Sequence, residues 1–262
     1  MKELMIVLDT TDMNHPRARK CIEYLKKTDL SLAELVIVDN VYSDGFNRGA
    51  CLEGFRRLAG ERPIILLQDD VFIEDARWLT KLRDVTLKPD VLVAGCLHSY
   101  ERSSDVFAGA LVGYDGRVEP VTHIAEATAE PLRYLPCILS GVVFIAEPEK
   151  LGLEAANITD NGKTDLYQDG LYEADICMQA WAMNKRVAAC LDLTVKRMLP
   201  HPSVLSKMVK DQPVDGDRFR LKWQVFIKDS LYAVQELKGL EKRLKEPSQP
   251  SPTPSHKERG TI

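Results

Sequence analysis

Short aliphatic runs alternate with segments of helical spacing along the N-terminal part of the chain, and this alternation restricts the fold more than any other feature. The runs are almost entirely aliphatic, which indicates strands that are buried on both faces. Strands of this kind, separated by helices, are typical of an open parallel sheet. We therefore predict parallel strands at Leu4–Leu8, Leu35–Val38, Ile64–Leu67 and Val91–Ala94.

Helices are expected between the early strands. Apolar residues at i, i+3, i+4 and i+7 after Pro16 predict the first helix, because proline suits the first turn of a helix. An apolar stripe over Asn47–Ala59 predicts the second helix, with Asn47 as its cap.

After residue 100 the pattern becomes mixed, and glycines separate short strand-like runs. Residues 137–146 form an aliphatic run that predicts a buried strand, interrupted by Ser140-Gly141. A short helix is expected at Ala174–Trp181, followed by a strand at Val187–Leu191. Apolar positions then recur at helical spacing over residues 217–245.

Composition and charge exclude several classes of partner and site. Lys and Arg number 35 against 39 Asp and Glu, and the resulting net charge of −4 supplies no basic field for nucleic acid. The six cysteines are scattered and form no CxxC pair, so we expect reduced packing residues, no zinc site and a cytoplasmic location. No run approaches the roughly 20 apolar residues of a transmembrane helix. The mildly basic end of the 217–245 segment leaves peripheral association with a membrane open.

Polar and acidic residues follow three of the predicted strands. Asp9 and Thr10 come after the first strand, Asp39 after the second, and Gln68-Asp69-Asp70 after the third. Ligands of open parallel sheets bind beyond the carboxyl ends of the strands, so these residues are candidates for one common site. The adjacent carboxylates would repel one another unless a Mg²⁺ or Mn²⁺ ion lay between them and a phosphate. The alternative is that each is an ordinary solvated turn or cap residue.

Five segments, in this order, resemble family 2 glycosyltransferases of the GT-A fold: ELVIVDN at 34–40, FNRGACLEGF at 46–55, ILLQDDV at 65–71, YLPCILSGVVFI at 134–145 and YEADICMQAWAMNKRVA at 172–188. The resemblance implies an α/β fold, with a Rossmann-like, mostly parallel central sheet flanked by helices, a mixed acceptor-side half and a C-terminal helical extension.

The resemblance also implies a division of the chain. Residues 1–110 would bind the nucleotide sugar, and residues 111–200 would form the acceptor-binding and catalytic half of the same domain. Residues 201–246 would form a loop and helical extension. Residues 247–262 are rich in proline and serine, so we expect a disordered tail.

By resemblance, Thr10 and Asp39 would bind the nucleotide, and Gln68, Asp69 and Asp70 would be the motif usually called DxD. Asp69 would face the ribose or the metal, and Asp70 would bind Mn²⁺ or Mg²⁺. The family often has Asp where this chain has Gln68. His201 would be a third metal ligand, or alternatively an exposed residue between two prolines.

The segment that ends in Asp175-Ile176-Cys177 matches the place where the family has its catalytic base. This register assigns the base to Glu173, where the family usually has Asp, and Asp175 is the second candidate. An inverting transfer needs one carboxylate that removes the proton of the acceptor hydroxyl. The alternative is that both acids only stabilise the start of a helix.

The resemblance therefore implies an inverting hexosyltransferase that moves a sugar from a nucleotide-diphosphate donor to a hydroxyl of a glycan, small molecule or protein. We expect a UDP-linked donor. One alternative is a catalytically inactive GT-A module that binds a glycan or a protein partner. Another is a sugar-nucleotide pyrophosphorylase, although the chain lacks the glycine-rich, basic loop that would hold a triphosphate after the first strand.

Overall fold

The computed structural model describes residues 2–10, 12–39, 48–101, 103–113, 116, 118–122, 132–151, 171–198, 216–217 and 219–228. Within these ranges the strands are β1 (Leu4–Thr10), β2 (Ala33–Asp39), β3 (Ile64–Gln68), β4 (Val71–Phe72), β5 (Val91–Tyr100), β6 (Val106–Val112), β7 (Val118–Thr122), β8 (Leu132–Tyr134), β9 (Val142–Ile145) and β10 (Arg186–Arg197). The α-helices are α1 (Pro16–Leu25), α2 (Arg48–Ala59), α3 (Trp78–Thr86) and α4 (Tyr172–Ala182), and Pro148–Lys150 form one 3₁₀ turn.

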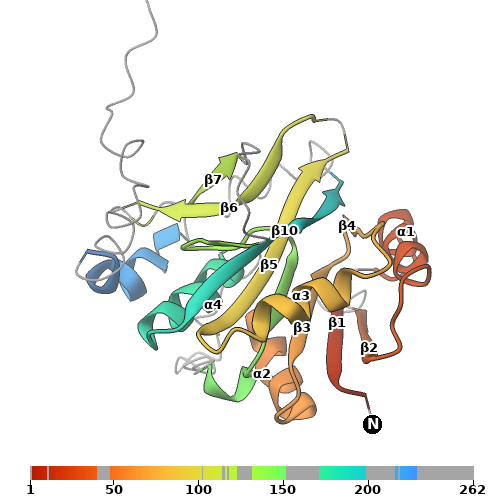
Figure 1. The fold of residues 1–262 in the computed structure, drawn as a ribbon, viewed down its shortest axis with the longest axis horizontal. Coiled ribbons are helices and arrows are strands. Elements are labelled where there is room, and N and C mark those ends of the chain that lie inside the picture. The colour runs from red at the N-terminus through yellow and green to blue at the C-terminus, as the bar shows by residue number, and fades with distance from the viewer. Residues whose placement is uncertain are drawn as a thin grey trace, which may run out of the picture.

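The described strands form one mixed sheet of ten strands, with the central order β2-β1-β3-β9-β5-β10-β4 (Figure 1). The predicted strands β1, β2, β3 and β5 are confirmed and run in one direction, because β9 lies antiparallel to both β3 and β5. Of the strand predicted at 137–146, only residues 142–145 form a strand, β9, which lies between β3 and β5. β6 and β7 extend the sheet as an antiparallel ribbon from β5.

Helices cover both faces of the sheet. On one face, α1 contacts β4, α3 contacts β5 and β10, and both helices share a core cluster with Leu4, Ile6 and Leu8 of β1. On the other face, α2 contacts β1 and α4 contacts β5 and β10, and these helices share a second core cluster with the intervening residues Met5 and Val7. This alternation is what a strand buried on both faces requires.

The helix after Pro16 is confirmed as α1. His15 caps it, because Nδ1 of its side chain accepts a hydrogen bond from the backbone N–H of Arg17 over 3.3 Å. The second predicted helix is confirmed as α2, whereas its expected cap Asn47 lies outside the described residues.

Helical backbone is present at residues 216–217 and 219–228, within the segment predicted from residue 217 onward. Phe219, Trp223 and Ile227 bury their side chains in the core on the α4 side of the sheet. The rest of that segment and the tail at 247–262 lie outside the described residues. Within the described ranges, no helix has the length and apolar character needed to cross a bilayer.

Strand β10 changes its pairing register midway. The C-terminal end of β10 lies near the C-terminal end of β3, which Asp69 and Asp70 follow. Between Cys190 and Thr194 the pairing with β5 shifts, as it does at a bulge. Beyond this shift, Arg197 pairs with Tyr100 of β5 and with Val71 of β4. The last residue of β10 is therefore next to Asp70 in space.

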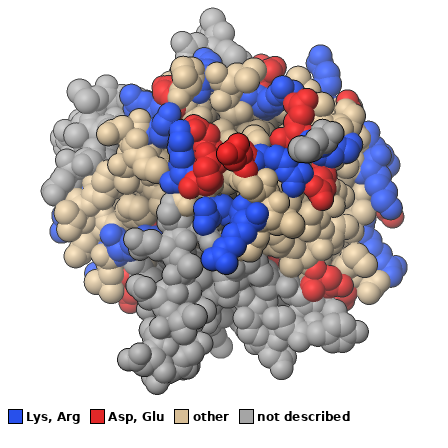
Figure 2. Space-filling model, turned by 90° about the horizontal axis from the view of Figure 1, so that it is seen from below, with Lys and Arg blue, Asp and Glu red and all other residues tan. Residues whose placement is uncertain are grey.

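Charged side chains of both signs lie close together on the face shown in Figure 2. Basic groups lie directly beside acidic groups there, and neither kind covers the face alone.

Candidate functional site

The ends of β1, β2 and β3 lie side by side. Thr10 is opposite Asp39 in the pairing of β1 with β2, and Asp9 is opposite Gln68 in the pairing of β1 with β3. The structure therefore brings the predicted nucleotide-binding residues to one edge of the sheet. Their roles stay predictions.

Asp69 is buried and held by two donors. The hydroxyl of Thr10 donates a hydrogen bond to Asp69 Oδ2 over 2.8 Å. Arg17, in the first turn of α1, places Nη2 2.8 Å from Asp69 Oδ1. Both carboxylate oxygens of Asp69 are thus occupied, one by a hydroxyl and one by a guanidinium.

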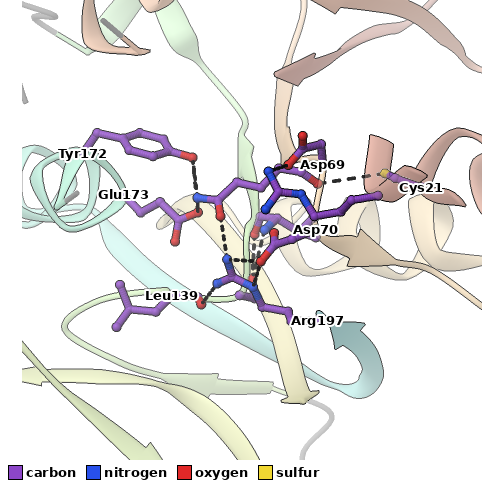
Figure 3. Close-up of polar contacts among 11 residues, drawn as sticks. Cys21, Asp69, Asp70, Leu139, Tyr172, Glu173 and Arg197 are labelled. Atoms are coloured by element: carbon purple, nitrogen blue, oxygen red, sulfur yellow. Dashed lines mark hydrogen bonds and ion pairs between the residues drawn. The ribbon is translucent and has the colours of Figure 1, made fainter. Parts of the chain in front are cut away.

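Asp70 forms an ion pair with Arg197 at the end of β10 (Figure 3). Arg197 Nη2 and Nε lie 2.8 Å and 3.1 Å from Asp70 Oδ2. Arg197 Nη1 donates to the backbone carbonyl of Leu139 over 3.0 Å. Burial alone lowers the pKa of Arg197, but the carboxylates of Asp70 and Glu173 outweigh it and raise that pKa above its usual value. The arginine is therefore a fixed positive charge.

Gly141 makes room for this guanidinium. Its φ of 72° is in the left-handed region, which suits glycine. A Cβ at this position would lie 2.7 Å from Val71 Cγ2 and 3.3 Å from Arg197 Cζ. The Ser140-Gly141 interruption noticed in the sequence thus permits a close approach of Arg197 and β4 to the start of β9.

Gln68 connects this ion pair to α4. Its side-chain oxygen accepts a hydrogen bond from Arg197 Nη2 over 2.5 Å. Its amide nitrogen donates to Glu173 Oε1 over 3.1 Å and to the Tyr172 hydroxyl over 2.9 Å (Figure 3). The partners on the two sides fix which way the amide points, since an arginine requires an acceptor and a carboxylate requires a donor.

Glu173 and Asp175 both lie in the first turn of α4 and are buried, but they face different partners. Glu173 contacts the strand end through Gln68. Asp175 Oδ1 accepts a hydrogen bond from Trp223 Nε1 over 2.6 Å, and Oδ2 accepts one from Lys222 Nζ over 3.0 Å. The structure therefore places Glu173, the first candidate base, at the strand-end cluster and directs Asp175 toward the C-terminal helix.

The helix that carries both acids starts under strain. Leu171, directly before α4, has φ of 60°, which is costly for a residue with a branched side chain. The N–H of Asp175 donates to the carbonyl of Leu171 over 2.8 Å and closes the first turn. This turn points Tyr172 and Glu173 at Gln68.

Asp39, at the end of β2, is exposed and accepts a hydrogen bond from the backbone N–H of Met13 over 3.2 Å. It therefore holds the loop between β1 and α1 in place.

The described residues do not fit a divalent cation. Among them, no group of three or more His, Cys, Asp and Glu side chains is arranged to hold a metal. Both oxygens of Asp69 and one oxygen of Asp70 already bind other side chains. Asp70 Oδ1 is buried without a hydrogen-bond partner among these residues, and it is the single oxygen left. Mg²⁺ requires near-octahedral oxygen coordination. His201 lies outside the described residues.

Three residues of this cluster were not expected from the sequence, namely Arg17, Tyr172 and Arg197. Arg197 had an indirect signal, because it lies four residues before His201, which the resemblance gives as a metal ligand. Tyr172 directly precedes Glu173, the first candidate base, and no local pattern marks it as a partner of Gln68. No local pattern marks Arg17 as a partner of Asp69.

No protein-family model matches this sequence, and comparison with curated proteins gives no match. The fold is similar to that of solved glycosyltransferases. A mannosyltransferase from Pyrobaculum calidifontis, in complex with GDP-Man and Mn²⁺, matches with a TM-score of 0.51 and 12% identity over 79% of this chain. GalNAc-T7 with UDP, GalNAc and Mn²⁺ matches with a TM-score of 0.52 and 10% identity over 90% of this chain.

This chain covers only 60% and 58% of the lengths of those two proteins. At such low identity the likeness concerns the fold alone. The chain has a mixed α/β structure with a central mixed sheet, and this matches the GT-A fold expected from the sequence.

Proposed function

We propose that this chain is an inverting glycosyltransferase of the family 2 type, which transfers a hexosyl group from a nucleotide-diphosphate sugar to an acceptor hydroxyl. The observation that carries the proposal is the 3.1 Å hydrogen bond from Gln68 Nε2 to Glu173 Oε1. It joins the strand-end edge, where the nucleotide would bind, to the helix turn that carries the candidate base. A donor and an acceptor bound on either side of this contact would meet beside Glu173.

Glu173 is the base in this proposal. It takes the proton of the acceptor hydroxyl while that oxygen attacks the anomeric carbon from the face opposite the nucleotide. The bond between the anomeric carbon and the phosphate oxygen breaks, and the nucleoside diphosphate leaves with the electron pair. Gln68 donates a hydrogen bond that holds the Glu173 carboxylate in place for the transfer.

On the donor side, Asp39 and Thr10 would contact the nucleotide, and Gln68 and Asp69 the ribose and diphosphate. Support comes from their common edge in the sheet and from the place of ligands in open α/β sheets. A UDP-linked donor stays our first expectation. The acceptor is a glycan, a small molecule or a protein.

Mn²⁺ or Mg²⁺ stays a prediction from the sequence. Both solved structures contain Mn²⁺, whereas the described side chains of this protein do not fit such an ion. Each step of the proposed transfer therefore uses only the chain's own residues. We also propose a cytoplasmic location, in keeping with the buried, unpaired cysteines of the described part of the chain.

One observation favours a second candidate, a GT-A module that binds a glycan or protein without catalysis. Asp69 and Asp70 are each paired with an arginine, so the two acids of the motif already have counter-charges. A module of this kind would bind its partner but would not turn over a nucleotide sugar.

A thermal-shift screen tests the proposed function. The full chain is melted with each of a set of UDP- and GDP-sugars, in one buffer with Mn²⁺ and in one with EDTA. A donor at a hundred times its Kd stabilises the native state by about 2.7 kcal/mol and raises the melting temperature by roughly 5–10 °C. The free sugars at equal concentration are the control. Melting temperatures unmoved by every donor in both buffers would contradict the proposal.

A further inference from the structure

We propose that the guanidinium of Arg197, held between Gln68 and Asp70, supplies the positive charge at the donor diphosphate, so that donor binding does not require a divalent cation. This inference rests on the proposed function. It concerns which group bridges the motif acids and the phosphates.

Arg197 is held where the motif acids would hold an ion. Its Nη2 and Nε donate hydrogen bonds to Asp70 Oδ2, over 2.8 Å and 3.1 Å. Nη2 also donates to Gln68 Oε1 over 2.5 Å. The carbonyl of Leu139 accepts from Nη1 at 3.0 Å. Oxygen ligands from several segments of the chain thus surround one fixed cation, and that cation is a guanidinium.

The guanidinium keeps one donor for a ligand. It carries five N–H groups, and the contacts to Asp70, Gln68 and Leu139 use four of them. Among the described residues, the second N–H of Nη1 has no partner. The Arg197 side chain is 15% exposed, and the proposal places a phosphate oxygen at this exposed part. Arginine suits this task, because its hydrogen bonds to phosphate are charge-assisted and directional.

A metal ion at the same place would meet strong repulsion. One oxygen of Asp70 remains, and an ion bound there would share that carboxylate with a guanidinium 2.8 Å from the other oxygen. Two positive charges so close together, in a partly buried place, repel strongly. The acid that would recruit a metal is thus neutralised by a residue of the chain itself.

Arg17 gives a second cation at the same edge. Its Nη2 lies 2.8 Å from Asp69 Oδ1 and its side chain is 23% exposed, although its Nε is buried. Each motif acid therefore positions one arginine. A diphosphate bound across the ends of β1 and β3 would have a guanidinium at either side.

The test measures binding of UDP and GDP to the full chain by titration calorimetry, in EDTA and in Mn²⁺. The variants are Arg197→Gln, which removes the charge, and Arg197→Lys, which keeps the charge but not the planar fork. The matched control is Lys196→Gln, because Lys196 is the neighbouring residue of β10 and pairs with Glu74 at the surface. Circular dichroism checks that each variant is folded.

The proposal predicts that the wild-type chain binds at least one of the two nucleotides with the same Kd in both buffers. Arg197→Gln should weaken this binding by about 10- to 100-fold, Arg197→Lys by less, and Lys196→Gln not at all. Should Arg197→Gln fail to fold, a weaker Kd of Arg197→Lys in EDTA still decides the question.

Binding that needs Mn²⁺ would overturn this inference and leave the proposed function standing. So would equal affinities of the wild-type, Arg197→Gln and Arg197→Lys chains in EDTA. If the folded wild-type chain bound neither nucleotide in either buffer, the proposed function would fail and this inference with it.

Discussion

The indole nitrogen of Trp223 lies 2.6 Å from Asp175 Oδ1, so the helix at 219–228 is tied to the first turn of α4. Glu173, two residues before Asp175, contacts Gln68 at the end of β3. Glu173 and Asp175, the first and second candidates for the base, therefore have different surroundings. One belongs to the strand-end cluster, and the other anchors the C-terminal helix.

Asp175→Asn is expected to lower the free energy of unfolding by about 1–3 kcal/mol, because the buried hydrogen bond from Trp223 and the partly buried one from Lys222 lose their charged acceptor. Urea denaturation measures this. Asp217→Asn, which removes an exposed ion pair with Arg220, is the control and should change stability little. Equal stability of the two variants would remove the anchoring role of Asp175.

Glu173→Gln should reduce glycosyl transfer by about 10²- to 10⁴-fold, because the amide keeps the size of the side chain but cannot accept the acceptor's proton. The donor Kd should hardly change, since Glu173 acts on the acceptor. Turnover and calorimetry measure the two quantities separately. Glu173→Asp, which keeps the carboxylate, should retain more activity than the Gln variant. A Gln variant with near-normal turnover would transfer the role of base to another residue.

Asp39→Ala should weaken donor binding by about 1–3 kcal/mol, the cost of leaving a nucleotide donor group unpaired. Titration with the donor found in the screen gives this number. Glu34→Ala is the control, because Glu34 lies on the same strand but pairs with Arg62 at the surface. If both variants bound the donor like the wild-type chain, Asp39 would lie outside the site.

His98 should make stability depend on pH. Burial, with a smaller contribution from Arg197, lowers its pKa to about 3, and its ring stacks on Phe107 with centroids 5.3 Å apart. In the unfolded chain His98 takes up a proton near pH 6.5, whereas in the folded chain it stays neutral. Its contribution to the free energy of unfolding is therefore fully present above pH 6.5. It is lost as the pH falls toward 3.

Between pH 7 and pH 5 the wild-type chain should therefore lose about 2 kcal/mol more stability than His98→Gln, which does not titrate. Urea denaturation of both chains at the two pH values gives the difference. Identical pH dependence of the two chains would show that His98 is protonated as easily in the folded state as in the unfolded one.

Much of the fold could be predicted, because each early strand carries its own aliphatic signal. The place of β9 could not be predicted, since a buried aliphatic strand looks the same in sequence whether its neighbours are parallel or antiparallel. The helix α3 was not predicted, although Trp78, Leu79, Leu82 and Val85 form one buried stripe.

The strand-end acids could be predicted as one cluster, because carboxyl ends of parallel strands meet at one edge of a sheet. The side chains that pair with these acids could not be predicted from the sequence. Arg197 lies 127 positions from Asp70, and Trp223 lies 48 from Asp175, so only the tertiary structure brings them together. The register shift in β10 determines the position of Arg197, and no local sequence pattern predicts this shift.

The most direct test of the account is the release of nucleoside diphosphate from a panel of nucleotide sugars, where water can replace the unknown acceptor. We predict slow release from at least one donor by the full chain, and release at least about 100-fold slower by Glu173→Gln. Release at the buffer rate from every donor, or equal release by the two chains, would contradict the assignment of this site as a glycosyltransferase centre.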